Sequence, residues 1–247
     1  MVWTFLYKES QAMRLKQITF TGIDEKTDIA ALKEIQKEYP MVEWGMLTSY
    51  HWGENGNRYP NPKLTKSLVS TGLNLSLHLC GKAAIDAANG QWNHIEGLVR
   101  HNLSLFKRIQ LNLAEKEDTP TTCCLPPYIK QEIIIQQRSI QEIGLYKRTM
   151  IHSPYYDYFS VLLDASGGRG TDTPIEVLKT KNHVGYAGGI NPDNVADKLS
   201  YLFSEVKEGT FWIDMESGVR TDDWFDLDKV VQVLEICKPI IEEGGAQ

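Results

Sequence analysis

The sequence predicts an α/β protein built as a single (β/α)8 barrel, with eight parallel strands that alternate with helices. Three observations support this prediction. Strand-like and helix-like runs alternate along the 247 residues. Eight such units in about 230 residues match the usual size of this barrel. Several strand-like runs also carry polar residues on one face. The main alternative is an open, doubly wound sheet, but no GxGxxG motif follows the first strand-like run.

The elements are expected in a regular order. The strand-like runs are residues 17–21, 42–49, 73–79, 108–113, 145–151, 160–163, 184–186 and 211–215. Between them, apolar residues recur at helical spacing in residues 28–38, 63–70, 83–88 with 95–105, 128–141, 175–179, 194–206 and 227–242. Strands that alternate with helices in this way run parallel and are joined by crossover connections.

The polar face of the strands favours the barrel over the open sheet. In residues 74–80, three leucines share one face, while Ser76, His78 and Cys80 share the other. A strand covered on both faces of an open sheet is usually apolar throughout. In a barrel, the polar face points inward, and active sites lie where the strands end. The residues expected to converge there are Thr21, Ser49, His78, Cys80, Gln110, Asn112, Asp164, Asp214 and Glu216.

Composition limits the partners that this chain is expected to have. We expect residues 1–15 to form a short N-terminal extension and residues 16–247 to form the barrel domain. The net charge is −6 and no stretch is strongly basic, so we expect no nucleic-acid partner. No apolar run approaches the roughly 20 residues of a membrane span, so we expect no membrane partner.

Cysteine usage indicates a reducing compartment. The four cysteines show no CxxC spacing, which favours a cytoplasmic protein without disulfides. A metal site could be formed by His78, Cys80, Asp214 and Glu216. Separate strands supply these residues without a motif, so we expect no metal. We expect no cofactor, and either a monomer or a homodimer.

Three glycine-rich turns late in the chain indicate a phosphate site. They contain Gly167 and Gly168 after the sixth strand, Gly188 and Gly189 after the seventh, and Ser217 and Gly218 after the eighth. Glycine lets the backbone approach a ligand closely and turn its N–H groups toward it. Barrels of this kind commonly bind phosphate with the loops that follow strands seven and eight. A phosphorylated small molecule is therefore the expected ligand.

The same turns carry a resemblance to a known family. The segment LLDASGGRG (162–170) resembles the LLD…GGTG segment of phosphoribosylanthranilate isomerases, which are barrels of tryptophan biosynthesis. YAGGINPDNV (186–195) is similar to the family's LAGGLNPENV, and IDMESGV (213–219) is similar to its DVSSGVE. The likeness covers most of residues 16–235. It implies an acid–base isomerisation of an aldose to a ketose.

The resemblance also implies roles for particular residues. Asp164 matches the family's general acid, which protonates the ring oxygen of the phosphoribosylamine. Arg58, in the loop after the second strand, matches an arginine that meets the substrate carboxylate, and Gln110 lies in a segment similar to the family's VQLHG. The phosphate-binding positions of the family fall on Gly167, Gly168, Gly188, Gly189, Ser217 and Gly218.

Two departures set this chain apart from the family. Thr21 stands where the family has its general base, a cysteine, and a threonine hydroxyl is no base near neutral pH without strong activation. Glu216 replaces the first serine after strand eight. We expect one of four residues to replace the base: Cys80, His78, Glu216 or Asp24. For His78 and Cys80, the alternative is that they only pack inside the barrel. The alternative function is a phospholigand- or nucleotide-binding barrel that has lost the base.

Overall fold

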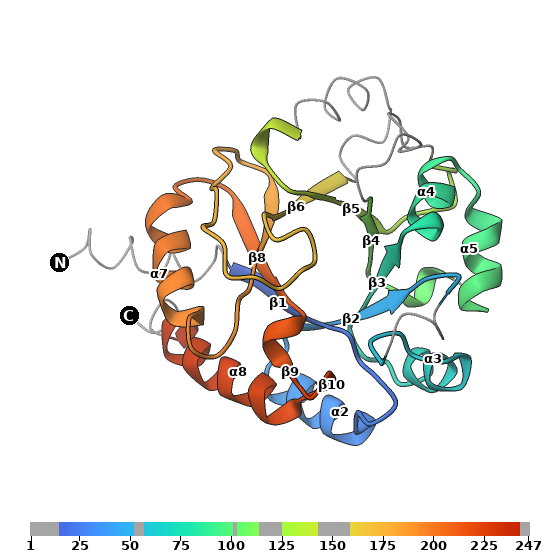
Figure 1. Cartoon of the computed structure of the whole chain (residues 1–247), viewed down its shortest axis with the longest axis horizontal. Helices are drawn as coiled ribbons and strands as arrows, with labels where there is room; N and C mark the ends of the chain where they lie inside the picture. Colours follow the sequence, from blue (N-terminus) through green and yellow to red (C-terminus); the bar gives the residue numbers. More distant parts are fainter. Residues whose placement is uncertain (1–14, 52–56, 101–102, 114–124, 143–158, 243–247) are drawn as a thin grey trace.

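The structure, a computed structural model, confirms the (β/α)8 barrel. It describes residues 15–51, 57–100, 103–113, 125–142 and 159–242. Eight parallel strands close into a barrel in chain order, β1 to β8, with the last paired to the first (Figure 1). The strands are β1 (Leu15–Thr21), β2 (Val42–Thr48), β3 (Leu75–Cys80), β4 (Arg108–Asn112), β5 (Glu132–Gln137), β6 (Phe159–Asp164), β7 (His183–Ala187) and β8 (Thr210–Met215).

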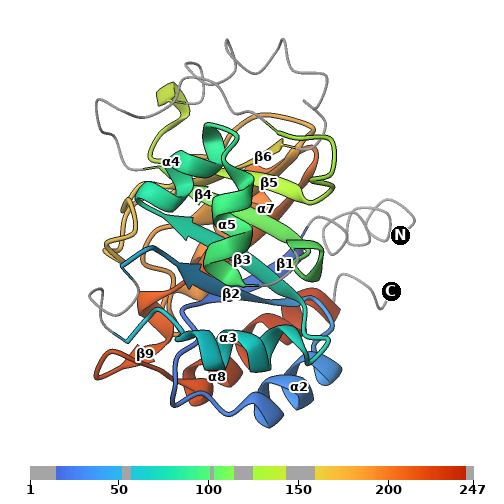
Figure 2. The same cartoon turned by 90° about the vertical axis from the view of Figure 1, so that its right-hand side faces the viewer.

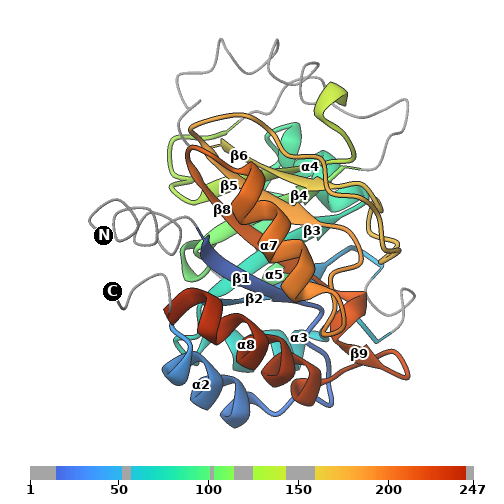
Figure 3. The ribbon, with the colours of Figure 1, turned by 90° about the vertical axis from the view of Figure 1, so that its left-hand side faces the viewer.

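Helices surround the barrel on its outside. They are α2 (Ile29–Glu38), α3 (Pro62–Val69), α4 (Lys82–Ala88), α5 (Trp92–Val99), α7 (Val195–Glu205) and α8 (Leu227–Glu242). Short 3-10 turns lie at Leu103–Leu105 and Ser217–Val219, and β9 (Arg220–Thr221) pairs with β10 (Trp224–Phe225) in a small hairpin. Figure 2 shows α4 and α5 outside β3 and β4, and Figure 3 shows α7 and α8 from the other side.

Local sequence explains where several helices begin. The Asp28 carboxylate accepts hydrogen bonds from the backbone N–H groups of Ala30 and Ala31, which caps α2. Asn61 caps α3 in the same way, with Pro62 at the first helical position, where its missing N–H costs nothing. Among the described residues, no helix has both the length and the apolar character to cross a membrane.

The fifth strand is not where the sequence analysis placed it. β5 is Glu132–Gln137, inside the segment predicted to be helical, while residues 145–151 lie outside the described residues. Ile133, Ile134 and Ile135 are all buried. Ile134 packs inward against Leu162 and Trp212. A β-branched run buried on both faces is typical of a parallel strand, and pairing with β4 and β6 fixes this run as a strand despite the helical spacing of the wider segment.

A second predicted helix is also absent. Residues 171–180 contain no helix. Ile175 and Val177 pack against the core from this non-helical segment. The predicted N-terminal extension, residues 1–15, lies outside the described residues except for Leu15, which begins β1.

The interior of the barrel is partly polar. Arg108 on β4 and Glu43 on β2 form a buried ion pair, with Arg108 Nη2 2.6 Å from Glu43 Oε1 and Arg108 Nε 2.8 Å from Oε2. Thr19 donates to the same carboxylate at 3.0 Å, and the guanidinium carbon lies 4.3 Å from the centre of the Trp212 ring. Gly185 leaves room for that ring, because a Cβ there would clash with it.

We predict that breaking this ion pair from one side destabilises the fold. Arg108→Met leaves the Glu43 carboxylate buried without its partner, which should lower the free energy of unfolding by about 3–5 kcal/mol. Urea unfolding followed by circular dichroism measures the change. Adding Glu43→Gln to Arg108→Met should recover most of the loss.

An exposed ion pair supplies the matched control. Glu34 and Lys37 on α2 are 3.9 Å apart and largely exposed, so Glu34→Gln should leave the unfolding free energy nearly unchanged. Equal stability of Arg108→Met and the unchanged protein would contradict the structural role of the buried pair.

Candidate active site

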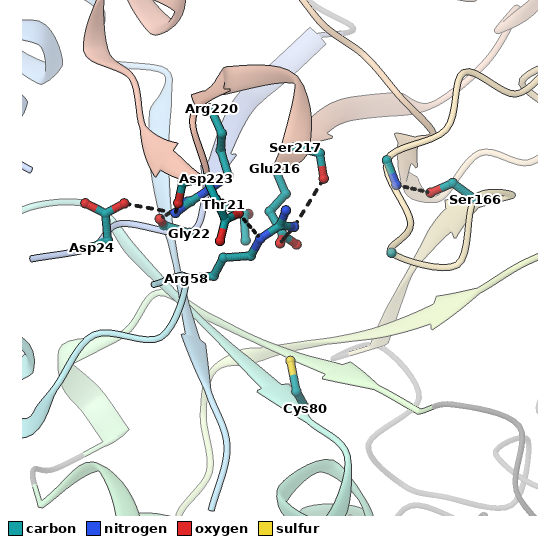
Figure 4. A network of polar contacts seen from close by, with 12 residues as sticks. Thr21, Gly22, Asp24, Arg58, Cys80, Ser166, Glu216, Ser217, Arg220 and Asp223 are labelled. Carbon is teal, nitrogen blue, oxygen red and sulfur yellow. Dashed lines mark hydrogen bonds and ion pairs between the residues drawn. The ribbon is translucent and has the colours of Figure 1, made fainter. Parts of the chain in front are cut away.

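The carboxyl ends of the strands bring the predicted residues to one end of the barrel, called here the mouth. Figure 4 shows Thr21, Arg58 and Glu216 there. At the seam where β1 meets β8, Thr21 donates a hydrogen bond to Asp214, with 2.8 Å between Oγ1 and Oδ1. Thr21 is 2% exposed and Asp214 is 6% exposed. Gly45, beside Thr21 on β2, has no side chain to compete for this space, because a Cβ there would clash with the Thr21 hydroxyl. The seam therefore holds a carboxyl group away from water.

The surroundings of Asp214 change its acidity. Burial is the largest effect and raises the pKa of the Asp214 carboxyl to about 8. The negative charges of Glu43 and Glu216 raise it further, while the Thr21 hydroxyl and the Arg108 charge act in the opposite direction. Asp214 is therefore mostly protonated at pH 7 and becomes a carboxylate in mildly alkaline solution.

Asp164 lies at the end of β6 in a different environment. Its carboxylate accepts hydrogen bonds from the backbone N–H groups of Ser166 at 3.1 Å and Gly168 at 2.6 Å. The Ser166 hydroxyl at 2.6 Å and Gln136 Nε2 at 2.7 Å donate as well. The Asp164 carboxylate therefore accepts hydrogen bonds from four donors. Three of these donors belong to the glycine-rich loop, so the loop and the carboxylate hold each other in place.

The three glycine-rich turns pack directly on one another. A Cβ at Gly170 would clash with Ser217, and one at Gly218 would clash with the backbone of Ile190. Gly189 packs in the same way on the backbone at Asp172. The loops after β6, β7 and β8 therefore form one continuous surface, which contains the six predicted phosphate-binding residues Gly167, Gly168, Gly188, Gly189, Ser217 and Gly218.

Side chains from α7 hold two of these loops together. Lys198 donates to the carbonyls of Thr173 at 3.0 Å and Gly188 at 3.2 Å, and its ammonium lies 2.7 Å from the Asp172 carboxylate. Asn194, at the N-terminus of α7, bonds the loop with its side chain: its amide donates to Gly189 O and its carbonyl accepts from Asn191 N.

Arg58 crosses the mouth from the loop after β2. Its Nη1 lies 2.7 Å from Glu216 Oε1 and 3.2 Å from Ser217 Oγ, and its Nε lies 2.9 Å from Asp223 Oδ1 (Figure 4). A second arginine, Arg220, donates to Gly22 O at 2.6 Å and pairs with Asp24 at 2.9 Å. The negative charge that Glu216 adds to the mouth is thus paired with Arg58.

The structure places the four predicted candidates for the missing base in different environments. Burial and the Arg108 charge lower the pKa of His78 to about 3, so its imidazole is a weak proton acceptor. Desolvation raises the pKa of the Cys80 thiol to about 11, so it stays protonated near neutral pH. Asp24 is held by Arg220 and by the backbone N–H of Phe225, which fixes it to the β9–β10 hairpin. Glu216 is paired with Arg58.

A row of polar side chains continues the mouth across β3 and β4. Gln110 Nε2 donates to Asn112 Oδ1 at 2.9 Å, and Asn112 Nδ2 lies 3.4 Å from Cys80 Sγ. Gln110 is thus buried beside the mouth, with its amide engaged by Asn112. Within the described ranges, no three histidine, cysteine or acidic side chains are grouped so that they could hold a metal ion.

Comparison with known proteins decides the family. The family model described as N-(5'phosphoribosyl)anthranilate (PRA) isomerase matches residues 108–236, more than half of the chain. The chain belongs to the phosphoribosylanthranilate isomerase family. The matched stretch contains Asp164, Asp214 and the three glycine-rich turns, whereas Thr21, Arg58, His78 and Cys80 lie before it.

Solved structures of the family share the fold. N-(5'-phosphoribosyl)anthranilate isomerase from Pyrococcus furiosus superposes with a TM-score of 0.51 at 15% identity, covering 90% of this chain and 98% of that one. Phosphoribosyl anthranilate isomerase from Thermococcus kodakaraensis gives a TM-score of 0.51 at 14% identity, covering 91% and 99%. A comparison with curated proteins gives no match.

Sequence reasoning placed Asp214 in the mouth but not among the candidates for the base. The signal was present, since Asp214 precedes Glu216 on the inward face of the last strand and Thr21 ends the first. In a closed barrel the first and last strands are neighbours, so these two residues were bound to lie close together.

We predict that Asp214→Asn stabilises the protein in a pH-dependent way. The folded-state pKa is raised, so the stability that Asp214 contributes is fully present below its ordinary pKa and is lost as the pH rises toward about 8. The asparagine variant lacks this loss. Its advantage in melting temperature should therefore grow between pH 5 and pH 8. An advantage that is constant over this range would show that Asp214 ionises normally in the folded protein.

Proposed function

We propose that the protein is an isomerase that converts an N-phosphoribosyl amine, an aldose derivative, into the corresponding 1-amino-1-deoxyribulose phosphate. Phosphoribosylanthranilate is the first substrate to test. The observation that carries the proposal is the presence of two carboxyl groups at one barrel mouth. Asp164 accepts four hydrogen bonds at the end of β6, and Asp214 is buried at the seam between β1 and β8. Membership of the family and the continuous glycine-rich surface support the same reaction.

Asp164 is the proposed general acid. It gives a proton to the furanose ring oxygen while the bond from that oxygen to C1' breaks, and the amine nitrogen supplies the electron pair that forms the iminium ion. Asp164 must be protonated first. The Gly168 N–H donates to Asp164 Oδ2, so a phosphate bound at this loop would lie beside the acid.

Asp214 is the proposed base, in place of the family's cysteine. As a carboxylate it takes the proton from C2', and the electron pair of the C2'–H bond forms the enolamine and neutralises the nitrogen. The enolamine then tautomerises to the ketone. A base whose pKa is near 8 accepts this proton more readily than an ordinary carboxylate. Thr21 acts as a positioning residue because its hydroxyl donates to Asp214.

One observation favours a second function, binding without turnover. Thr21 itself is not a base, and its hydroxyl proton is directed to Asp214. A barrel that keeps the phosphate surface and lacks turnover would be a binding protein for a phosphorylated ligand. The assay below separates these two functions.

We predict turnover of phosphoribosylanthranilate, seen as loss of substrate fluorescence. Asp164→Asn and Asp214→Asn should each lower kcat by at least ~100-fold, the usual scale of acid–base catalysis. The rate should rise with pH through about 8 as Asp214 ionises. Asp197→Asn, an exposed carboxylate on α7, is the matched control and should keep full activity. Ligand binding without turnover in the unchanged protein would favour the binding function.

We also predict opposite effects of two substitutions at Thr21. Thr21→Cys places a thiol where the family has one and should raise kcat by about tenfold. Thr21→Val removes the hydroxyl that lowers the pKa of Asp214, so the rising limb of the pH–rate profile should move to higher pH. A Thr21→Val profile that coincides with that of the unchanged protein would contradict the positioning role.

A further inference from the structure

Arg58 reaches the part of the mouth where the phosphate surface begins. Its Nη1 lies 3.2 Å from the hydroxyl of Ser217, one of the predicted phosphate-binding residues. The same nitrogen lies 2.7 Å from Glu216 Oε1. The guanidinium therefore points at the turn after β8, and a carboxylate of the protein itself takes the contact that an anionic ligand at Ser217 would use.

Two carboxylates hold the Arg58 guanidinium through different nitrogens. Nε bonds to Asp223 at 2.9 Å, on the turn between β9 and β10, where Asp222 and Asp223 have φ of 50° and 59°. Arg220 fixes that turn by donating to the Asp223 carbonyl at 2.6 Å. The Asp223 contact thus belongs to a braced hairpin, while the Glu216 contact depends on a single side chain.

The Glu216 carboxylate lies in surroundings that disfavour its negative charge. Burial raises the pKa of its carboxyl, and the negative charge of Asp164 adds to the effect, while Arg58 and Arg220 oppose it. A phosphate dianion carries more charge than a carboxylate, and its oxygens match the planar fork of an arginine. A phosphate at Ser217 can therefore compete with Glu216 for Nη1, whereas a singly charged anion competes poorly.

We propose that Arg58 is a direct ligand of the substrate phosphate and that Glu216 is the internal anion which the phosphate displaces from it. The proposal deepens the proposed function, because it rests on the phosphate surface formed by the three loops. It differs from the role that the family resemblance implies for Arg58, contact with a substrate carboxylate. It also gives Glu216 a function: the pair selects ligands with a dianionic phosphate.

Titration calorimetry with inorganic phosphate and with ribose 5-phosphate tests the proposal. Arg58→Gln should weaken binding of both ligands by about tenfold or more, the scale of a hydrogen bond to a charged group. Arg58→Lys keeps the positive charge but loses the planar guanidinium, so its phosphate affinity should lie between those of Arg58→Gln and the unchanged protein. Glu216→Gln should tighten binding by about three- to tenfold, because it removes the competing charge.

A matched control separates this effect from net charge. Lys66→Gln, on the exposed face of α3, removes one positive charge away from the mouth and should leave phosphate affinity unchanged. Circular dichroism and thermal melts confirm that each variant is folded. Unchanged affinity in Arg58→Gln would overturn the proposal. So would weaker binding in Glu216→Gln, or the absence of phosphate binding in both the unchanged protein and Glu216→Gln at millimolar phosphate.

The binding experiment does not depend on turnover. Absence of isomerase activity together with the expected order of phosphate affinities would refute the proposed reaction and leave the role of Arg58 standing. Isomerase activity together with normal phosphate binding by Arg58→Gln would refute the role of Arg58 alone.

Discussion

The hydrogen bond between Thr21 and Asp214 lies at the seam where the first and last strands pair and close the barrel. Closure removes Asp214 from water and brings it beside Thr21. The layer below is the Arg108–Glu43 pair, whose charges act on Asp214 in opposite directions. A carboxyl group in this setting keeps its proton at neutral pH, and this single property makes it a candidate for proton transfer.

The mouth divides into two halves, one inside and one outside the stretch that the family model matches. The loops after β6, β7 and β8 carry Asp164 and the glycine-rich turns, and the family model matches this half. The ends of β1, β2 and β3 carry Thr21, Arg58 and Cys80, and the match does not reach them. One departure from the family, Thr21, lies outside the matched stretch where the base is expected, and the other, Glu216, lies inside it beside the phosphate surface.

Much of the fold could be predicted from sequence because strand and helix signals are local. β5 was missed since three consecutive isoleucines fit a buried helix as well as a buried strand, and only pairing with β4 and β6 distinguishes them. Asp164 and the glycine turns were found because each is a short contiguous motif. The Thr21–Asp214 and Arg58–Glu216 contacts join residues 193 and 158 positions apart, so no local pattern contains them.

The ionisation of Asp214 in the folded protein can be measured directly. Carbon-13 NMR of the aspartate carboxyl groups, with Asp214→Asn to assign the resonance, follows its ionisation in the folded protein without any substrate. The account predicts a midpoint near pH 8, as burial at the seam requires. A midpoint near pH 4 would mean that the seam leaves Asp214 ionised under all ordinary conditions, and it would contradict the assignment of Asp214 as a base tuned by burial.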